Sequence, residues 1–286
     1  MNWMLLVLFY GVMKGCREVT KKLSLQKNTA LEVLLYYTFI SFLMVIPQAP
    51  KAMGVSPAQY GWIALKSFII FVAWICSFYA IKRLPISLYG VLDLSRVLFA
   101  TLLGVLVLGE SMGMPQIVGL MLVCAGLIFL KVFDRKKEGD PQNRRTQWIF
   151  VLLAFLSCML NAVSGLMDKI LMKDLNSSQL QFWYMLFLLL YYVLYFVFTR
   201  TKIQVKTLVK NYWVYLLSIM FVLADKALFI ANADPDSKVT VMTLIKQSGV
   251  IVTILGGKMI FREEKTLQRL LCAGVIIAGI LVAVWV

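Results

Sequence analysis

The sequence predicts an all-α integral membrane protein whose ten transmembrane helices form two inverted five-helix repeats. The first observation behind this prediction is composition: of 286 residues, 61% are hydrophobic, and the mean hydropathy is +0.83. Soluble globular domains are typically about 45–50% apolar. The second observation is the spacing of apolar runs, and the third is the recurrence of short motifs in the two halves of the chain.

Ten apolar runs are long enough to cross a bilayer, which takes about 20 helical residues. A long polar stretch, residues 134–146, leaves five of these runs on each side. It is expected to be a cytoplasmic linker between a first repeat at 1–133 and a second repeat at 147–286. The predicted helices cover residues 2–24, 31–48, 60–82, 86–109, 114–133, 147–172, 178–199, 211–232, 238–260 and 267–286.

Short motifs recur in the same order in both halves. The fourth segment ends in GVLVLGES (104–111), and the ninth ends in GKMIFREE (257–264). Because each half holds an odd number of helices, the second copy must be inverted in the membrane, which is a common plan of secondary transporters. A shift of 153 positions relates the matched residues, which are Gly104 and Gly257, Ser95 and Ser248, and Glu110 and Glu263.

The net charge of +15 comes mainly from Lys and Arg in the loops. Loops after odd-numbered segments are basic, whereas those after even-numbered segments hold little beyond Lys51, Lys173 and Lys238. The positive-inside rule then predicts a protein of the cell membrane whose two termini are external. Because the basic residues lie between apolar segments, anionic lipid headgroups explain them better than nucleic acid does.

Cysteine and histidine usage argues against cofactors and catalysis. All five cysteines lie inside apolar segments without a CxxC pair, and the chain has no His. Zinc sites, haem and disulfide scaffolds are therefore not expected. The HExxH and GxSxG motifs are also absent from the sequence, so we do not expect an enzyme.

Ten charged residues interrupt the apolar segments. Each would cost roughly 2.5–3.5 kcal/mol at the centre of a lipid-facing helix, so such residues face a partner or a watery cavity and mark a candidate site. These ten residues are Lys14, Arg17, Glu18, Asp93, Arg96, Asp168, Lys169, Asp225, Lys226 and Lys246.

The first segment concentrates four charges on one helical face. Lys14, Arg17, Glu18 and Lys21 are spaced i, i+3, i+4 and i+7. One interpretation is an anion-binding face that includes a carboxylate. The alternative is that the helix ends early and these side chains snorkel to the cytoplasmic interface, which is the expectation for Lys21.

The fourth and ninth segments place opposite charges at matched positions. Tyr89, Asp93 and Arg96 share a face of the fourth segment, and the shift of 153 places Asp93 on Lys246, which is followed by Gln247. Asp93 and Lys246 could form an ion pair that locks the halves together. They could instead hold opposite ends of a zwitterion.

The sixth and eighth segments each carry an Asp-Lys pair. Adjacent residues cannot share a helical face, so one member of each pair is expected to bind ligand and the other to contact a neighbouring helix. Ion pairs between the repeats are the alternative. The candidate binding residues here are Asn161, Ser164, Asp168 and Lys169 in the sixth segment, and Asp225 and Lys226 in the eighth.

Among the ten intramembrane charges, cations outnumber carboxylates by two. Six are Lys or Arg and four are Asp or Glu. Cations without a protein partner favour an anionic ligand, and the carboxylates suit an amine or hydroxyls on the same molecule. Proton coupling is a further candidate, because Glu18 and Asp93 are titratable.

Four features of the chain occur together: the two five-helix halves, Gly11 within the first segment, FYAIKRLPIS (78–87), and the ends of the fourth and ninth segments. In these features the chain resembles the drug/metabolite transporter superfamily in its ten-helix EamA-type branch. The resemblance implies a secondary carrier with a central cavity lined by helices one, three, four, six, eight and nine. Many members have apolar cavities and cytoplasmic termini, and this chain departs from both patterns.

The predicted function is therefore secondary transport. A small polar anionic or zwitterionic metabolite would cross the bilayer by alternating access through a central charged cavity. The alternative is a flippase for a phosphate-linked lipid or a lipid-linked sugar. The expected partners are that metabolite and the lipid bilayer, with protons as candidate coupling ions.

Overall fold

A computed structural model describes residues 3–108, 113–135, 141–200, 203–234, 237, 242 and 245–284. Every regular element in these ranges is a helix. The first half contains α1 (Trp3–Ser24), α2 (Ala30–Val45) with the 3₁₀ helix η1 (Ile46–Lys51), α3 (Pro57–Arg83), α4 (Ile86–Asp93), α5 (Arg96–Leu108) and α6 (Met114–Arg135). The second half contains α7 (Pro141–Leu171), α8 (Ser177–Thr199), the short α9 (Val205–Val209), α10 (Tyr212–Ala233), α12 (Gly249–Phe261) and α13 (Thr266–Val284).

The length and hydropathy of these helices fit a multi-pass membrane protein. Shorter apolar helices lie within α6, α12 and α13. The helix α1 has the length to cross a bilayer, but its charged residues lower its hydropathy. Among the described residues, five segments are both long and apolar enough to span a membrane, and these are Ala30–Lys51, Pro57–Arg83, Gln147–Leu171, Ser177–Thr199 and Tyr212–Ala233.

Capping boxes fix where three of the long helices begin. Thr29 accepts a hydrogen bond from the backbone N–H of Glu32, and the Glu32 carboxylate accepts one from the backbone N–H of Thr29. The same reciprocal pattern begins α3 at Ser56 and α8 at Asn176. Each box satisfies backbone donors that a helix start leaves unpaired.

The predicted fourth helix is not continuous. It is divided into α4 and α5 by a turn at Leu94 and Ser95, where hydrogen bonds to the third preceding residue replace the helical pattern. Asp and Ser are poor residues for a helix interior because their side chains compete with the backbone for hydrogen bonds. Asp93 and Ser95 lie on either side of Leu94, and the Asp93 carboxylate is directed to Lys14 and Arg96 rather than to the helix backbone.

The predicted ninth helix has a similar turn, at Gln247 and Ser248, before α12 begins. Part of its start, residues 238–241 and 243–244, lies outside the described residues. The linker expected at 134–146 is shorter than predicted, because α6 continues to Arg135 and α7 already begins at Pro141.

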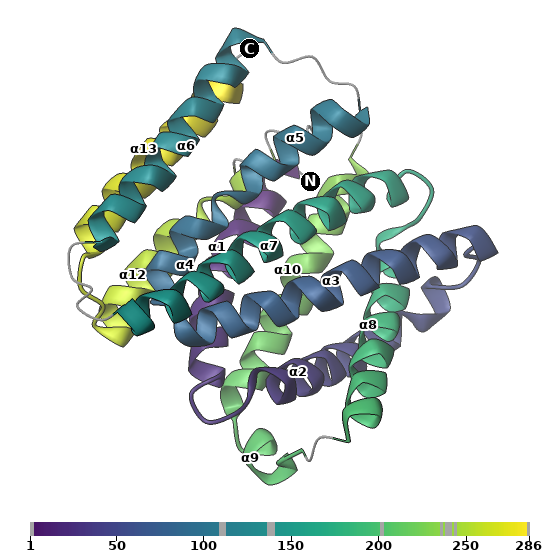
Figure 1. Cartoon of the computed structure of the whole chain (residues 1–286). Helices are drawn as coiled ribbons and strands as arrows, with labels where there is room; N and C mark the ends of the chain where they lie inside the picture. Colours follow the sequence, from purple (N-terminus) through teal and green to yellow (C-terminus); the bar gives the residue numbers. More distant parts are fainter. Residues whose placement is uncertain are drawn as a thin grey trace.

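Close helix contacts order the bundle. The helix α1 packs on α10, α7 packs on α3, and α6 pairs with α13 along one side of the molecule (Figure 1). The helix α1 also meets α12, where the backbones of Gly11 and Gly15 approach that of Gly249 so closely that an added Cβ on any of them would collide. Small residues of this kind let membrane helices approach each other.

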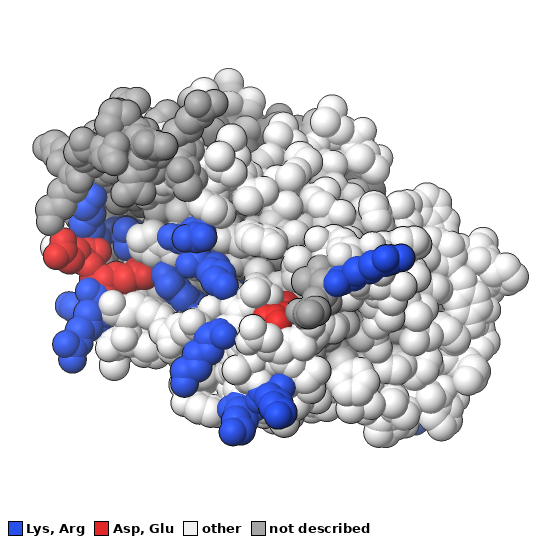
Figure 2. Space-filling view, turned by 60° about the horizontal axis from the view of Figure 1, so that its bottom comes forward, with Lys and Arg blue, Asp and Glu red and all other residues white. Residues whose placement is uncertain are grey.

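Basic side chains gather at one end of the bundle. Both the start of α1 and the end of α13 lie toward the top of Figure 1. Lys and Arg side chains gather on the opposite side, which comes forward in Figure 2. The basic loops and the termini therefore occupy different ends of the bundle.

Candidate functional site

The middle of the bundle contains charged side chains that are almost fully buried. The helix α1 contributes Lys14, Arg17, Glu18 and Lys21, each exposed by less than a tenth of its surface. Removing charges from water costs several kcal/mol per ion unless partners compensate. The partners of these residues therefore define the site.

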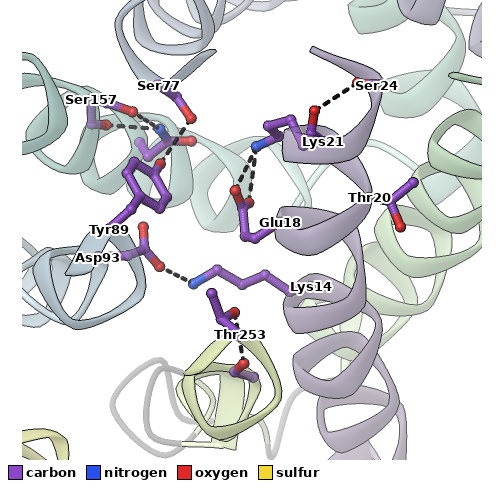
Figure 3. A network of polar contacts seen from close by, with 12 residues as sticks. Lys14, Glu18, Thr20, Lys21, Ser24, Ser77, Tyr89, Asp93, Ser157 and Thr253 are labelled. Atoms are coloured by element: carbon purple, nitrogen blue, oxygen red, sulfur yellow. Dashed lines mark hydrogen bonds and ion pairs between the residues drawn. The ribbon is translucent and has the colours of Figure 1, made fainter. Parts of the chain in front are cut away.

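Lys14 and Arg96 share one carboxylate. Lys14 reaches from α1 to Asp93 Oδ2 at the end of α4, as Figure 3 shows. Arg96 Nη2, at the start of α5, donates to Asp93 Oδ1 at 3.0 Å. The alternative in which Asp93 pairs with Lys246 is therefore wrong for this structure, since Lys14 on the neighbouring helix occupies the carboxylate instead.

Arg17 links α1 to α10. Its Nη1 lies 3.4 Å from Asp225 Oδ1. The guanidinium also lies 5.1 Å from the ring centre of Phe221 and 5.7 Å from that of Tyr10. A cation over aromatic faces is stabilised by the ring quadrupole, so Arg17 is held by one carboxylate and two rings.

Glu18 forms an ion pair within its own helix. Its two carboxylate oxygens each lie 2.9 Å from Lys21 Nζ, and Figure 3 shows both side chains on the same side of α1. Lys21 Nζ is also 4.8 Å from the ring centre of Phe78. The expectation that Lys21 snorkels to the interface is wrong, because this helix stays inside the bundle as far as Ser24, which is fully buried.

Asp168 pairs with a lysine that the sequence analysis did not select. Lys66 on α3 is only 2% exposed, and its Nζ lies 3.1 Å from Asp168 Oδ1 on α7. The ammonium also lies 3.6 Å from the ring centre of Tyr184. The signal was present, because Lys66 interrupts an apolar segment just as Lys14 does.

Lys246 is the least satisfied cation of the group. Its Nζ lies 5.8 Å from the ring centre of Tyr10, and no carboxylate in the described ranges forms an ion pair with it. The charge of Asp168 attracts it, whereas those of Arg96 and Lys14 repel it. Its neighbour Gln247 is buried.

Two of the neutral candidates, Tyr89 and Asn161, make hydrogen bonds to nearby residues. Tyr89 on α4 hydrogen-bonds Ser77 on α3 at 2.8 Å (Figure 3). Asn161 donates to the carbonyl of Ser157, one turn earlier on the same helix, at 2.8 Å. Ser164 is buried on the same helix.

Lys169 and Lys226 lie apart from these charges. Lys169 Nζ donates to the Asn232 carbonyl and to Ser237 Oγ, beyond the end of α10. Lys226 Nζ donates to Gln48 Oε1 on η1 at 2.7 Å and to Ser178 Oγ at the start of α8. Both lysines therefore contact polar groups near helix ends, which removes them from the central site.

The remaining ionic residues form what we call the central charge set. It keeps six cations and four carboxylates, because Lys21 and Lys66 replace Lys169 and Lys226. An excess of two positive charges therefore remains. Its members are Lys14, Arg17, Lys21, Lys66, Arg96, Lys246, Glu18, Asp93, Asp168 and Asp225.

A second ionic cluster joins α1, α4 and α13 around the turn between α12 and α13. Glu263, between α12 and α13, accepts hydrogen bonds from the backbone N–H groups of Ile86 at 2.6 Å and Ser87 at 3.0 Å, which begin α4. Lys22 of α1 lies 3.3 Å from the same carboxylate, and Arg269 of α13 lies 3.2 Å from it. Burial opposes ionisation of Glu263, but these hydrogen bonds outweigh it and hold the pKa of Glu263 below its usual range.

Comparison with known proteins identifies the first half of the chain. Residues 1–132 match the model of the EamA-like transporter family. This part of the chain is therefore similar to the EamA-like transporter family. The family consists of transporters rather than enzymes, and it is part of the drug/metabolite transporter superfamily that the sequence resembles.

A solved structure is similar in fold over nearly the whole chain. It is described only as "Crystal structure of protein", and it matches with a TM-score of 0.69 over 99% of this chain and 96% of its own. The sequence identity is 14%, so this likeness shows the fold alone. No curated protein matches the chain in sequence.

Proposed function

We propose that this EamA-type protein is a secondary transporter for a small polar metabolite that is anionic or zwitterionic. The excess of two cations in the central charge set is the observation that carries this proposal. Buried charges without protein partners are expensive, and an anionic group on the substrate would compensate them. The buried carboxylates suit an amine or hydroxyl on the same molecule.

Alternating access would use two inverted five-helix repeats. Two observations support this arrangement. The turns that divide the fourth and ninth segments fall at Leu94–Ser95 and Gln247–Ser248, which the shift of 153 relates. The packing of α1 on α10 has its counterpart in that of α7 on α3, and the contact of α1 with α12 has its counterpart in that of α7 with α5.

The proposed orientation follows the loop charges. The end of the bundle that carries the basic loops would face the cytoplasm, and both termini would be external in the cell membrane. The Glu263 cluster lies at the basic end and joins α1, α4, α12 and α13. It would therefore hold the cytoplasmic side closed in this conformation and separate when that side opens.

Ligand-induced thermal stabilisation of the detergent-purified protein tests the proposal. The panel would contain phosphorylated sugars, nucleotide sugars, organic acids, amino acids and polyamines. Stabilisation by anions or zwitterions is expected, because a ligand that binds only the folded state raises its stability. Stabilisation only by polyamines would contradict the substrate class, and stabilisation only by lipid phosphates would indicate a flippase.

A further inference from the structure

The two halves of the chain carry a matched ion pair with its charges exchanged. Tyr10-Gly11-Val12-Met13-Lys14 in α1 aligns with Ser164-Gly165-Leu166-Met167-Asp168 in α7, which places Lys14 on Asp168. The shift of 153 places Asp93 on Lys246. The counterpart of the Lys14–Asp93 pair in the second half is therefore an Asp168–Lys246 pair.

The structure forms the first of these pairs and not the second. Lys14 contacts Asp93 directly. Asp168 instead lies 3.1 Å from Lys66 Nζ, and Lys246 makes no ion pair within the part of the chain that the structure describes. Asp168 and Lys246 still attract each other through their charges. In the second half, the Lys66–Asp168 pair therefore takes the place of the symmetric Asp168–Lys246 pair.

Lys66 is well placed to hold Asp168 away from Lys246. Its side chain is 2% exposed and its ammonium lies over the Tyr184 ring, with the Phe229 ring centre 5.8 Å away. A lysine packed in this way has few other rotamers available. Its ammonium and the Asp168 carboxylate therefore face each other inside the bundle, 3.1 Å apart.

We infer that Lys66 is a positioning residue that occupies Asp168 so that Lys246 stays free to bind the anionic group of the substrate. This inference rests on the proposed function and names the cation that anchors the anion. Donors lie around the same region: Arg96 Nε and Ser248 Oγ are buried and have no hydrogen-bond partner among the described residues. The anionic group would therefore bind Lys246 with Arg96 beside it.

Asp168 becomes a competitor of the substrate for Lys246 once Lys66 is removed. In Lys66→Met the freed Asp168 carboxylate would move to Lys246, since no other charge holds it. If Asp168 then occupies Lys246 about nine-tenths of the time, the apparent affinity for an anion falls about tenfold. Removing both charges, in Lys66→Met with Asp168→Asn, would free Lys246 again.

The test measures thermal stabilisation of the full-length protein in detergent by inorganic phosphate and by succinate, with chloride at equal ionic strength as the control. Wild type, Lys66→Met, Asp168→Asn and the double variant are compared. We expect the apparent affinity for phosphate and succinate to fall about tenfold in Lys66→Met and to return to the wild-type value in the double variant. In Asp168→Asn we expect it to be unchanged or higher. The double variant removes a buried pair as a unit, so it and Asp168→Asn test the inference even if Lys66→Met does not fold.

Three outcomes would overturn the inference. Equal anion affinity in wild type and Lys66→Met would show that Asp168 does not compete for Lys246. Weakened affinity in Asp168→Asn or in the double variant would show that Asp168 binds the ligand itself or that Lys66 acts by another route. If neither anion stabilised wild type, Lys246 would not be an anchor for anions. The proposed transport would still stand if another compound of the metabolite panel stabilised the protein.

Discussion

Removal of the Asp93 carboxylate is the perturbation whose effect the structure specifies most fully. Asp93→Asn keeps the size of the side chain but leaves both Lys14 and Arg96 without an anionic partner. Breaking a buried ion pair by removing one partner costs about 3–5 kcal/mol. We expect Asp93→Asn to fall in or above this range, because two cations lose the same partner.

The reciprocal change should cost less. In Lys14→Met the Asp93 carboxylate keeps Arg96 at 3.0 Å, so the loss is that of one charge-assisted hydrogen bond, about 1.5–3 kcal/mol. The double variant Lys14→Met with Asp93→Asn leaves only Arg96 unpaired. The Arg96 side chain is more exposed than that of Lys14, at 23% against 8%. Stability should therefore decrease from wild type to Lys14→Met, then to the double variant, and then to Asp93→Asn.

Thermal unfolding of the four purified proteins in one detergent measures this order. Asp93→Asn should also show a larger stabilisation by inorganic phosphate than wild type, because its central charge set has a greater excess of cations. An Asp93→Asn protein as stable as Lys14→Met would refute the assignment of both cations to one carboxylate. A smaller phosphate effect would refute the charge argument.

Three further changes test other parts of the molecule. Gly249→Ala should destabilise the protein by about 1–3 kcal/mol, because the added methyl group would overpack against α1. Gly274→Ala is the control, because open space surrounds that position, and it should not destabilise the protein. Thermal unfolding of the two variants distinguishes these outcomes. Glu263→Gln should lower stability at neutral pH. The pKa of Glu263 is lowered in the folded protein. The extra stability of wild type over Glu263→Gln is therefore complete above the pKa of Glu in the unfolded chain, about 4.3, and is lost as the pH falls through the pKa of Glu263 in the folded protein. Unfolding measured from pH 7 to pH 3 tests this. Lys226→Met should leave the apparent affinity for phosphate unchanged, because that lysine contacts only polar groups near helix ends.

The fold was largely predictable because hydropathy dominates in a membrane chain. Most long apolar runs form single helices, whereas the fourth is divided into α4 and α5 and the ninth has a turn at Gln247 and Ser248. Polar residues such as Thr29 and Ser56 set where helices begin. The break at Leu94 was not predicted. Its neighbours Asp93 and Ser95 are residues of low helix propensity, which a hydropathy count treats as tolerated exceptions.

The candidate site was predicted as a set of residues but not as a set of pairs. A buried charge can be recognised from sequence because its cost does not depend on its partner. Which partner it has depends on helix rotation and on neighbours that are distant in sequence. Lys14 therefore pairs with Asp93 rather than remaining free, and Lys226 contacts helix ends rather than the centre.

Lys66 shows the limit most clearly. It satisfies the same criterion as Lys14, since both interrupt an apolar segment, but its importance becomes visible only beside Asp168. The apparent symmetry between Asp93 and Lys246 suggested a direct pair. The structure instead gives each of the two carboxylates, Asp93 and Asp168, a cation from a neighbouring helix.

The central claim is that a transported anion binds the free cation at the middle of the bundle. Its most direct test is exchange in proteoliposomes of the best stabilising anion from the ligand panel. Wild type is compared with Lys246→Gln and with Lys258→Gln, which removes an exposed lysine of α12. We predict that Lys246→Gln loses exchange about tenfold or more, equivalent to about 1.4 kcal/mol, while Lys258→Gln exchanges like wild type. Normal exchange by correctly inserted Lys246→Gln would contradict the account.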